Sequence, residues 1–255
     1  MVKFDNPVIE HKTDHCHVVT FGRLPQMVDC SATFVGALQM AKELGVAPHR
    51  VCVLKPASDA SKPGFQVIQR AELGTSSVAD RQQADGAILL SLDTAVVLPT
   101  GDCPAVVINN VATGRMVVFH AGRPALTPPT DCCGCSANIV SFGFRNAVSG
   151  TVAEHLRVFI TGSISPEHFR HDNEDAQKLV KPFLDTYGPS VFAGDPKDGE
   201  LDLVGLITRQ LIGYGVLEEY IVHDGVCTFS DERLASHRRE GRTFRNVTIA
   251  INGPI

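Results

Sequence analysis

The stretch ADGAILLSLDTAVVLPTGDCPAVVINNVATGRMVVFHAG, residues 84–122, consists of four short apolar runs separated by polar and turn-forming residues. Runs this short and this rich in valine and isoleucine predict strands that are buried on both faces. Because so little chain separates them, we expect all four to be neighbouring strands of one sheet. The runs are Gly86–Ser91, Thr94–Leu98, Pro104–Ile108 and Arg115–His120.

Helices and further strands are predicted on both sides of this stretch. Residues 31–45, SATFVGALQMAKELG, begin with a serine suited to an N-cap, repeat apolar residues at helical spacing and end in glycine. Similar patterns predict helices over 137–148, 172–186 and 201–214, and strands over 51–54, 158–161, 219–222 and 247–251. Residues 55–64 and 123–134 are predicted loops, and Pro124, Pro128 and Pro129 exclude a regular helix in the second.

The order of these elements predicts the fold class. Helices and strands are interspersed without strict alternation, which indicates an α/β protein with a mixed β-sheet core and flanking helices. No composition shift or linker divides the chain, so we expect a single domain over residues 1–255.

Composition excludes several classes of protein. The 255 residues carry a formal net charge of −5, and 44% of them are hydrophobic, as in ordinary globular proteins. A mildly acidic chain lacks the basic face that nucleic-acid and anionic-membrane binders need. No run approaches the roughly 18 apolar residues that span a bilayer. The charged N-terminus lacks the apolar segment of a signal peptide, so we expect a cytoplasmic protein whose eight cysteines are reduced.

Cys103 and His120 are the strongest candidates for chemistry. Cys103 precedes one predicted strand and His120 ends the next, so an antiparallel pair would bring both to the same edge of the sheet. There the imidazole could generate a thiolate nucleophile, or the two side chains could bind a metal such as zinc. The alternative is a buried cysteine and a hydrogen-bonded core histidine, which is the commoner situation for such residues.

Residues 84–110 resemble the YfiH or laccase-domain family, in which an ADALIT-like strand leads to a TADC motif and another strand. GRMVVFHAG, residues 114–122, is similar to the strand of that family that ends in HAGWRG. Later segments follow the family in the same order. They are ISP at 164–166 (IGP in the family), LDLVGLITRQLIGYGV at 201–216 (LDL…NRRQL…GV), CT at 227–228 and SHRREG at 236–241 (SYRRDG).

The resemblance implies a mixed α/β fold related to the catalytic domain of cytotoxic necrotizing factor toxins. It also implies a metal, usually zinc, held by two histidines and one cysteine with one open position. Members were first described as polyphenol oxidases and are now regarded as enzymes of purine nucleoside phosphorolysis and adenosine deamination. Cys103 matches the metal-binding cysteine of TADC, Asp102 the aspartate beside it, and His120 the metal-binding histidine of HAGWRG. These three residues are therefore predicted at the catalytic centre.

Basic residues complete the site that the resemblance implies. Arg238 and Arg239 match an arginine pair of the family and are predicted to hold phosphate or a carboxylate by charge-assisted hydrogen bonds. A surface ion-pair network is the alternative for this pair. Arg123 takes the place of the family's tryptophan and is a further catalytic candidate. The expected partners are a nucleoside and phosphate, and a homo-oligomer is compatible with the sequence.

The chain departs from the family where the metal would bind. The family's first histidine belongs to a QVHG motif, but this chain reads LKPAS at 54–58 and has no histidine between Arg50 and His120. HAGWRG has become HAGRPA, and EHFRHD at 167–172 replaces a segment with cysteine and tyrosine. Zinc sites rarely use fewer than three protein ligands, so Cys103 and His120 alone would bind the ion weakly.

Other histidines and cysteines were considered as replacement ligands. His15 and His17 would share one face of a strand, and His168 and His171 have the i, i+3 spacing of a helix, although such pairs are more often solvated surface residues. The cluster CCGC contains Cys132, Cys133 and Cys135 but lacks the CxxC spacing of metal ligands, so we interpret it as a loop of small thiols rather than a redox-sensitive or metal-binding tip.

Three functions remain open from the sequence. The first is an enzyme of purine nucleoside chemistry, with zinc as its cofactor if a third ligand exists. The second is a metal-free hydrolase or deamidase with Cys103 as the nucleophile and His120 as its base, a chemistry that the related toxin fold makes available by analogy. The third is a non-catalytic descendant that keeps the fold and binds a small ligand or a partner.

Overall fold

The computed structural model describes residues 7–25, 31–56, 68–77, 79–128, 138–241 and 244–253. Its strands are β1 (Ile9–Lys12), β2 (Cys16–Pro25), β3 (Val51–Lys55), β4 (Ile68–Arg70), β5 (Gln82–Gln83), β6 (Gly86–Leu89), β7 (Thr94–Thr100), β8 (Ala105–Asn110), β9 (Arg115–His120), β10 (Leu156–Thr161), β11 (Ile221–His223) and β12 (Phe244–Asn252). Its α-helices are α1 (Ser31–Glu43), α2 (Arg123–Leu126), α3 (Ile139–Val148), α4 (Glu174–Tyr187), α5 (Leu203–Gly213) and α6 (His237–Glu240).

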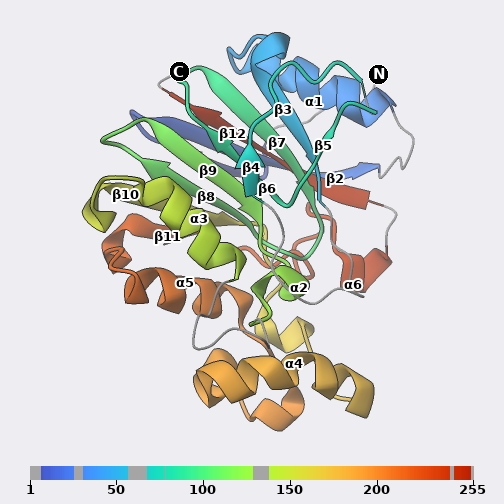
Figure 1. The fold of residues 1–255 in the computed structure, drawn as a ribbon. Coiled ribbons are helices and arrows are strands. Elements are labelled where there is room, and N and C mark those ends of the chain that lie inside the picture. The colour runs from blue at the N-terminus through green and yellow to red at the C-terminus, as the bar shows by residue number, and fades with distance from the viewer. Residues whose placement is uncertain are drawn as a thin grey trace.

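Two mixed sheets form the centre of the molecule, and helices lie outside them (Figure 1). The first sheet has the strand order β1-β2-β12-β7-β3-β5, and the second has the order β11-β10-β8-β9-β6-β4. Most neighbouring strands are antiparallel, whereas β3 and β7, β3 and β5, β4 and β6, and β10 and β11 run parallel. The predicted α/β class with a mixed sheet core and flanking helices is confirmed.

Alternation along the strands explains why both faces of each sheet are apolar. In β8, Val107 belongs to the core between the two sheets, while Val106 and Ile108 face the core on the side of α3 and α5. In β7, Val96 and Leu98 face the other sheet, while Val97 faces the core that includes α1 residues. Successive side chains of a strand point to opposite faces, so a strand packed on both sides must be apolar throughout.

Side-chain caps fix where the longer helices begin. Asn138 accepts hydrogen bonds from the amides of residues 140 and 141 at the start of α3, and Asn173 accepts one from the amide of residue 176 in α4. Asp202 caps α5 in the same way through the amide of Gly205. Because an N-cap residue has an extended backbone, each of these helices begins two residues after the start of its predicted range.

One of the four central strands lies in a different sheet from the one predicted. β6, β8 and β9 are neighbours in the second sheet, but β7 crosses to the first sheet, where it pairs with β12 and β3. The chain changes sheets through a short turn in which Asp93 has a φ of 52°. All four runs are apolar on both faces, so the pattern that predicted them as strands carries no information on which sheet each joins.

The loop predicted over 123–134 also needs correction at its start. Residues 123–126 form the one-turn helix α2, with Pro124 in the first turn. Proline suits that position, because its missing N–H would have no partner within the helix and its fixed φ is already helical. The Cys132, Cys133 and Cys135 cluster and most of the predicted 55–64 loop lie outside the described residues. The single-domain organisation of residues 1–255 stays a prediction.

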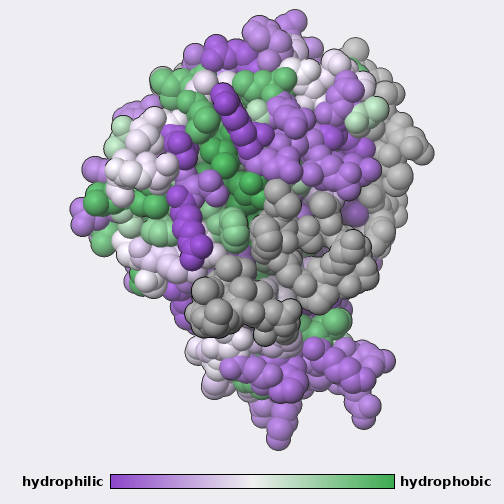
Figure 2. Space-filling view, in the orientation of Figure 1, coloured by the Kyte–Doolittle hydropathy of each residue, from purple (hydrophilic) through white to green (hydrophobic). Residues whose placement is uncertain are grey.

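The helices of the described residues are too short or too polar to cross a membrane. Figure 1 shows α4 at the lower end of the molecule, beyond α2 and α5. Figure 2 shows that this end is mostly hydrophilic. The sheets therefore form the main body of the protein, and α4 extends from it.

Candidate active site

Cys103 and His120 lie together at one end of the β8–β9 hairpin. Ala105, at the start of β8, pairs with His120 at the end of β9, which places Cys103, two residues before Ala105, beside the imidazole. Gly122 packs against both side chains. A Cβ built on Gly122 would lie 3.2 Å from the Cys103 Sγ and 3.3 Å from the His120 Nε2. The prediction that the thiol and the ring meet at one edge of the sheet is confirmed.

Asp85 holds the other side of the imidazole. It directly precedes β6, which pairs antiparallel with β9, so its carboxylate reaches the His120 Nδ1, 3.1 Å from Oδ1. The His120 amide also donates to the Asp85 carbonyl at 2.7 Å, and the Asp85 side chain is fully buried. Sequence reasoning missed Asp85, although its place directly before a strand of the same sheet was a usable signal. The three residues form a Cys–His–Asp row with a partly exposed thiol at its outer end.

This environment determines the charge of the imidazole. Burial by itself would lower the pKa of His120, because it removes water from the imidazolium. Electrostatic interaction with Cys103, together with hydrogen bonds to Asp85 and Cys103, outweighs burial and raises the pKa to about 10. The ring is therefore an imidazolium at neutral pH, with Nδ1 bonded to Asp85 and Nε2 turned toward Cys103.

Asp102 connects the cysteine segment to two other loops. Its Oδ1 accepts a hydrogen bond from the Thr228 hydroxyl at 2.8 Å, and its Oδ2 accepts one from the Arg238 amide at 2.8 Å. The Asp102 carbonyl accepts a further bond from the Ile164 amide at 2.9 Å. These contacts give the carboxylate a positioning role, since they join motifs that are far apart in the sequence. A direct catalytic role for Asp102 stays a prediction.

Two guanidinium groups lie close to the Cys103–His120 pair. Arg123 begins α2 directly after Gly122. Burial is the main cause that lowers the pKa of Arg123, and repulsion from Arg238 lowers it further, whereas attraction to Cys103 raises it. Arg238 belongs to α6, and its guanidinium lies over the Phe169 ring, 5.2 Å from the centroid. The structure thus brings Arg123 and Arg238 near each other. Anion binding by these residues stays a prediction.

Arg239 has a different environment from its neighbour. Its guanidinium donates hydrogen bonds to the backbone carbonyls of Thr228, Phe229, Asp231 and Leu234, and it pairs with Glu240 at 3.5 Å. These bonds hold the 228–234 loop in place beneath α6. For Arg239 this arrangement is closer to the alternative given above, a structural network at the surface, than to a substrate-binding role. Substrate binding by Arg239 stays a prediction.

Comparison with known proteins identifies the family. The family model described as multi-copper polyphenol oxidoreductase laccase matches residues 38–252. The chain belongs to the laccase-domain family. No curated protein matches the sequence.

Solved structures of laccase-domain proteins share this fold. They include the hypothetical protein YfiH of Bacillus licheniformis, with 16% identity and a TM-score of 0.69 over 93% of this chain and 92% of that one. YlmD of Geobacillus stearothermophilus has 18% identity and a TM-score of 0.70 over 93% and 91% of the two chains. Neisseria meningitidis NMB0706 has 17% identity and a TM-score of 0.67 over 98% of each chain. At these identities the likeness establishes the fold.

The donor set does not fit the three-ligand metal site of the laccase-domain family. Within the described part of the chain, no group of three or more His, Cys, Asp and Glu side chains is arranged to hold a metal ion. Cys103 and His120 match two of the three ligands that the resemblance implies, and the sequence has no histidine between Arg50 and His120. Zinc with fewer than three protein ligands would be weakly bound.

The histidine pairs considered as replacements do not form ligand pairs. His15 is an exposed turn residue before β2, whereas His17 lies in β2 and bonds Glu10 through Nε2 at 2.7 Å. His168 stacks on Phe229 and bonds the hydroxyl of Ser230. His171 is buried elsewhere, against the Gly199 carbonyl. The favoured interpretation, a solvated surface pair, does not hold for His17 or His171, because both are buried.

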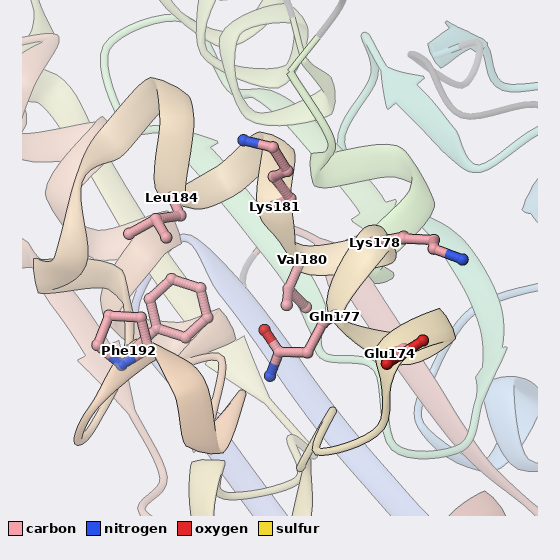
Figure 3. Close-up of a pocket in the computed structure, with 8 residues that line it drawn as sticks. Glu174, Gln177, Lys178, Val180, Lys181, Leu184 and Phe192 are labelled. Atoms are coloured by element: carbon pink, nitrogen blue, oxygen red, sulfur yellow. The ribbon is translucent and has the colours of Figure 1, made fainter.

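A surface pocket lies away from this laccase-domain site. It has a volume of about 270 Å³ and is lined by residues of α4 together with Phe192 and Pro196. In Figure 3 the side chains of Val180 and Leu184 turn toward Phe192, whereas the amino groups of Lys178 and Lys181 point away from it. None of the predicted site residues lines this pocket, so it adds nothing to the chemistry of Cys103 and His120.

Proposed function

We propose that the chain is an enzyme of purine nucleoside chemistry that cleaves the N-glycosidic bond by phosphorolysis at the Cys103–His120 site. Membership of the laccase-domain family supports the substrate class through the resemblance described above. The observation that carries the proposal is the His120 ring, which is bonded to Asp85 on one side and turned toward Cys103 on the other. Arg123, which interacts electrostatically with Cys103, and Arg238, which lies over Phe169, would hold an anion there.

Each group has a defined task in this reaction. Arg123 and Arg238 hold phosphate by charge-assisted hydrogen bonds. A phosphate oxygen forms a bond to C1′ of the ribose while the bond from C1′ to the base nitrogen breaks and its electron pair stays with the base. His120 donates the Nε2 proton to the leaving base and regains a proton from the phosphate that has reacted. Asp85 and Cys103 keep the imidazole protonated and oriented until that step.

Zinc and adenosine deamination are the other properties that the family resemblance implies. If zinc were bound, Cys103 and His120 would be its ligands, and it would activate water for deamination. The described residues supply no third ligand, so the donor set disfavours a tightly held ion. Phosphorolysis needs an acid and an anion site instead, which His120, Arg123 and Arg238 would supply.

The proposal is tested by incubating the purified chain with inosine or adenosine and separating the products by chromatography. We expect release of the free base together with ribose 1-phosphate, with a rate that depends on phosphate and is unchanged after dialysis against EDTA. Release of base without phosphate, loss of turnover in EDTA, or no reaction with any purine nucleoside would each contradict the proposal.

The Cys–His–Asp row also supports a second candidate, a metal-free hydrolase or deamidase. In this reaction the Cys103 thiolate attacks an amide carbon, and His120 passes its proton to the leaving amine. Water then attacks the resulting thioester, His120 takes a proton from that water, and the thiol is released. The observation that favours this chemistry is the bond from Asp85 to the His120 Nδ1, which orients the ring as in nucleophilic triads.

Alkylation distinguishes this candidate from the first. A thiolate nucleophile should react with iodoacetamide at neutral pH rapidly and stoichiometrically at Cys103, and much more slowly in His120→Asn. Cys227 needs its own control: burial raises the pKa of that thiol, but hydrogen bonds from Ser165 and Ser230 outweigh it and lower the pKa. The reaction is therefore followed by peptide mass spectrometry in a Cys227→Ser background. Slow alkylation of Cys103 would eliminate the second candidate, and failure of both tests would leave a non-catalytic protein.

A further inference from the structure

His171 is a buried imidazole that the proposed reaction does not use. Its side chain is 1% exposed and lies in the segment that departs from the laccase-domain pattern. The Nδ1 atom is 3.1 Å from the carbonyl oxygen of Gly199. The Nε2 atom is shielded from solvent and has no hydrogen-bond partner among the residues that the structure describes. A buried polar atom without a partner is uncommon and indicates a missing ligand or water.

The contact with Gly199 determines which nitrogen of His171 carries the proton. A carbonyl oxygen only accepts hydrogen bonds, so the proton of a neutral ring must lie on Nδ1. Burial lowers the pKa of His171 to about 4; the bond to Gly199 opposes this, and the positive charges of Arg123 and Arg238 assist it. The ring is therefore neutral at physiological pH, and Nε2 presents a lone pair that can accept one hydrogen bond.

The cationic residues of the candidate active site lie near this acceptor. Phe169 lies edge-on to the His171 ring, with centroids 4.7 Å apart, and Arg238 lies over the same phenyl ring. Arg123 and Arg238 both act electrostatically on His171 and on each other. Two cationic donors and one neutral acceptor thus lie near one another around Phe169. An anion that also carries a proton would complement this set, whereas a fully deprotonated anion would leave Nε2 unpaired.

We propose that His171, Arg123 and Arg238 form a subsite for hydrogen phosphate, in which the P–OH group donates to Nε2 and the anionic oxygens accept from the guanidinium groups. The same subsite disfavours sulfate, which has no proton to donate at neutral pH. This inference rests on the proposed function only where it gives phosphate a role in catalysis. The binding of phosphate itself is inferred from the environment of the three side chains.

The test compares the binding of inorganic phosphate, arsenate and sulfate to the full chain by isothermal titration calorimetry at pH 7.5 and constant ionic strength. Phosphate and arsenate should bind with similar affinity, and sulfate should bind more weakly by about ten- to a hundred-fold, because an acceptor left without a donor is costly. If the wild-type protein binds phosphate and sulfate equally, or does not bind phosphate, the proposal is overturned.

Variants at His171 separate the acceptor from the structural bond. In His171→Asn the side-chain amide can still donate to the Gly199 carbonyl, but no atom replaces Nε2, so the preference for phosphate over sulfate should fall to near unity. In His171→Gln the side-chain amide lies near the position of Nε2, but the hydrogen bond to the Gly199 carbonyl is lost. The matched control is His168→Asn in the same segment, whose ring bonds Ser230 and should not affect the preference. A phosphate preference that survives in folded His171→Asn would refute the role of Nε2.

The outcomes also separate this inference from the proposed function. Selective phosphate binding without nucleoside turnover would keep the subsite and remove phosphorolysis. Phosphorolysis with an unchanged KM for phosphate in His171→Asn would keep the function and remove the subsite.

Discussion

Replacing His120 with asparagine is expected to lower kcat/KM for phosphorolysis by about 10²- to 10⁴-fold, the range that general acids contribute. Asparagine can donate to Asp85 from the position of Nδ1, so the buried carboxylate keeps a partner, but it has no atom at the position of Nε2. The measurement is the rate of base release at saturating phosphate. Wild-type activity should also fall as the pH rises through about 10, where the imidazolium loses its proton.

The matched control for this variant is His155→Asn, because His155 is an exposed residue far from the β8–β9 end that holds the site. It should retain wild-type turnover. Circular dichroism should show that both variants are folded. Retained phosphorolysis in a folded His120→Asn protein would show that the acid is another group, and the central assignment of the site would be wrong.

Replacing Asp102 with alanine is expected to lower the free energy of unfolding by about 2–4 kcal/mol, because two hydrogen bonds to a buried charged group are lost. The Asp102 carboxylate is 5% exposed and bonds both the Thr228 hydroxyl and the Arg238 amide. Its loss should also release α6 from the sheet edge, so the KM for phosphate should rise together with the loss of stability. Urea denaturation and steady-state kinetics measure the two effects.

Asp185→Ala is the control for the Asp102 variant. Asp185 forms an exposed i, i+4 pair with Lys181 on α4, and such pairs contribute only about 0.3–0.5 kcal/mol. If Asp102→Ala unfolds at the same urea concentration as Asp185→Ala, the connecting role of Asp102 would be disproved. A stable Asp102→Ala protein with reduced kcat and unchanged KM would instead indicate a direct catalytic role.

The contribution of the sequence is clearest around the β8–β9 hairpin. Two adjacent apolar runs joined by a short turn commonly pair antiparallel, and β8 and β9 do so, which is how Cys103 and His120 could be predicted together from their spacing. The position of Asp85 beside His120 could be predicted in the same way, but only if it were known that β6, rather than β7, pairs with β9. The sequence could not provide this, because β6 and β7 have the same apolar pattern.

The basic side of the site was harder to predict for a different reason. Arg238 and Arg239 are adjacent in the sequence and carry the same charge, yet one lies over Phe169 beside the site and the other bonds backbone carbonyls. The direction of each side chain depends on how α6 packs against the 228–234 loop. His171 is a further example: its spacing from His168 suggested a pair, whereas its environment comes from Gly199 and Phe169.

By itself the sequence determined the fold class, most of the strands and helices, and the meeting of a thiol and an imidazole at one sheet edge. These depend on local periodicity and on pairing between neighbours in the chain, which residue order encodes directly. Only the tertiary structure decided which sheet β7 joins, that Asp85 completes the row, and that a nitrogen of His171 has no partner among the described residues and lies near two arginines. Those features depend on packing between segments far apart in the chain, and the residues involved carry no local pattern that specifies their partners.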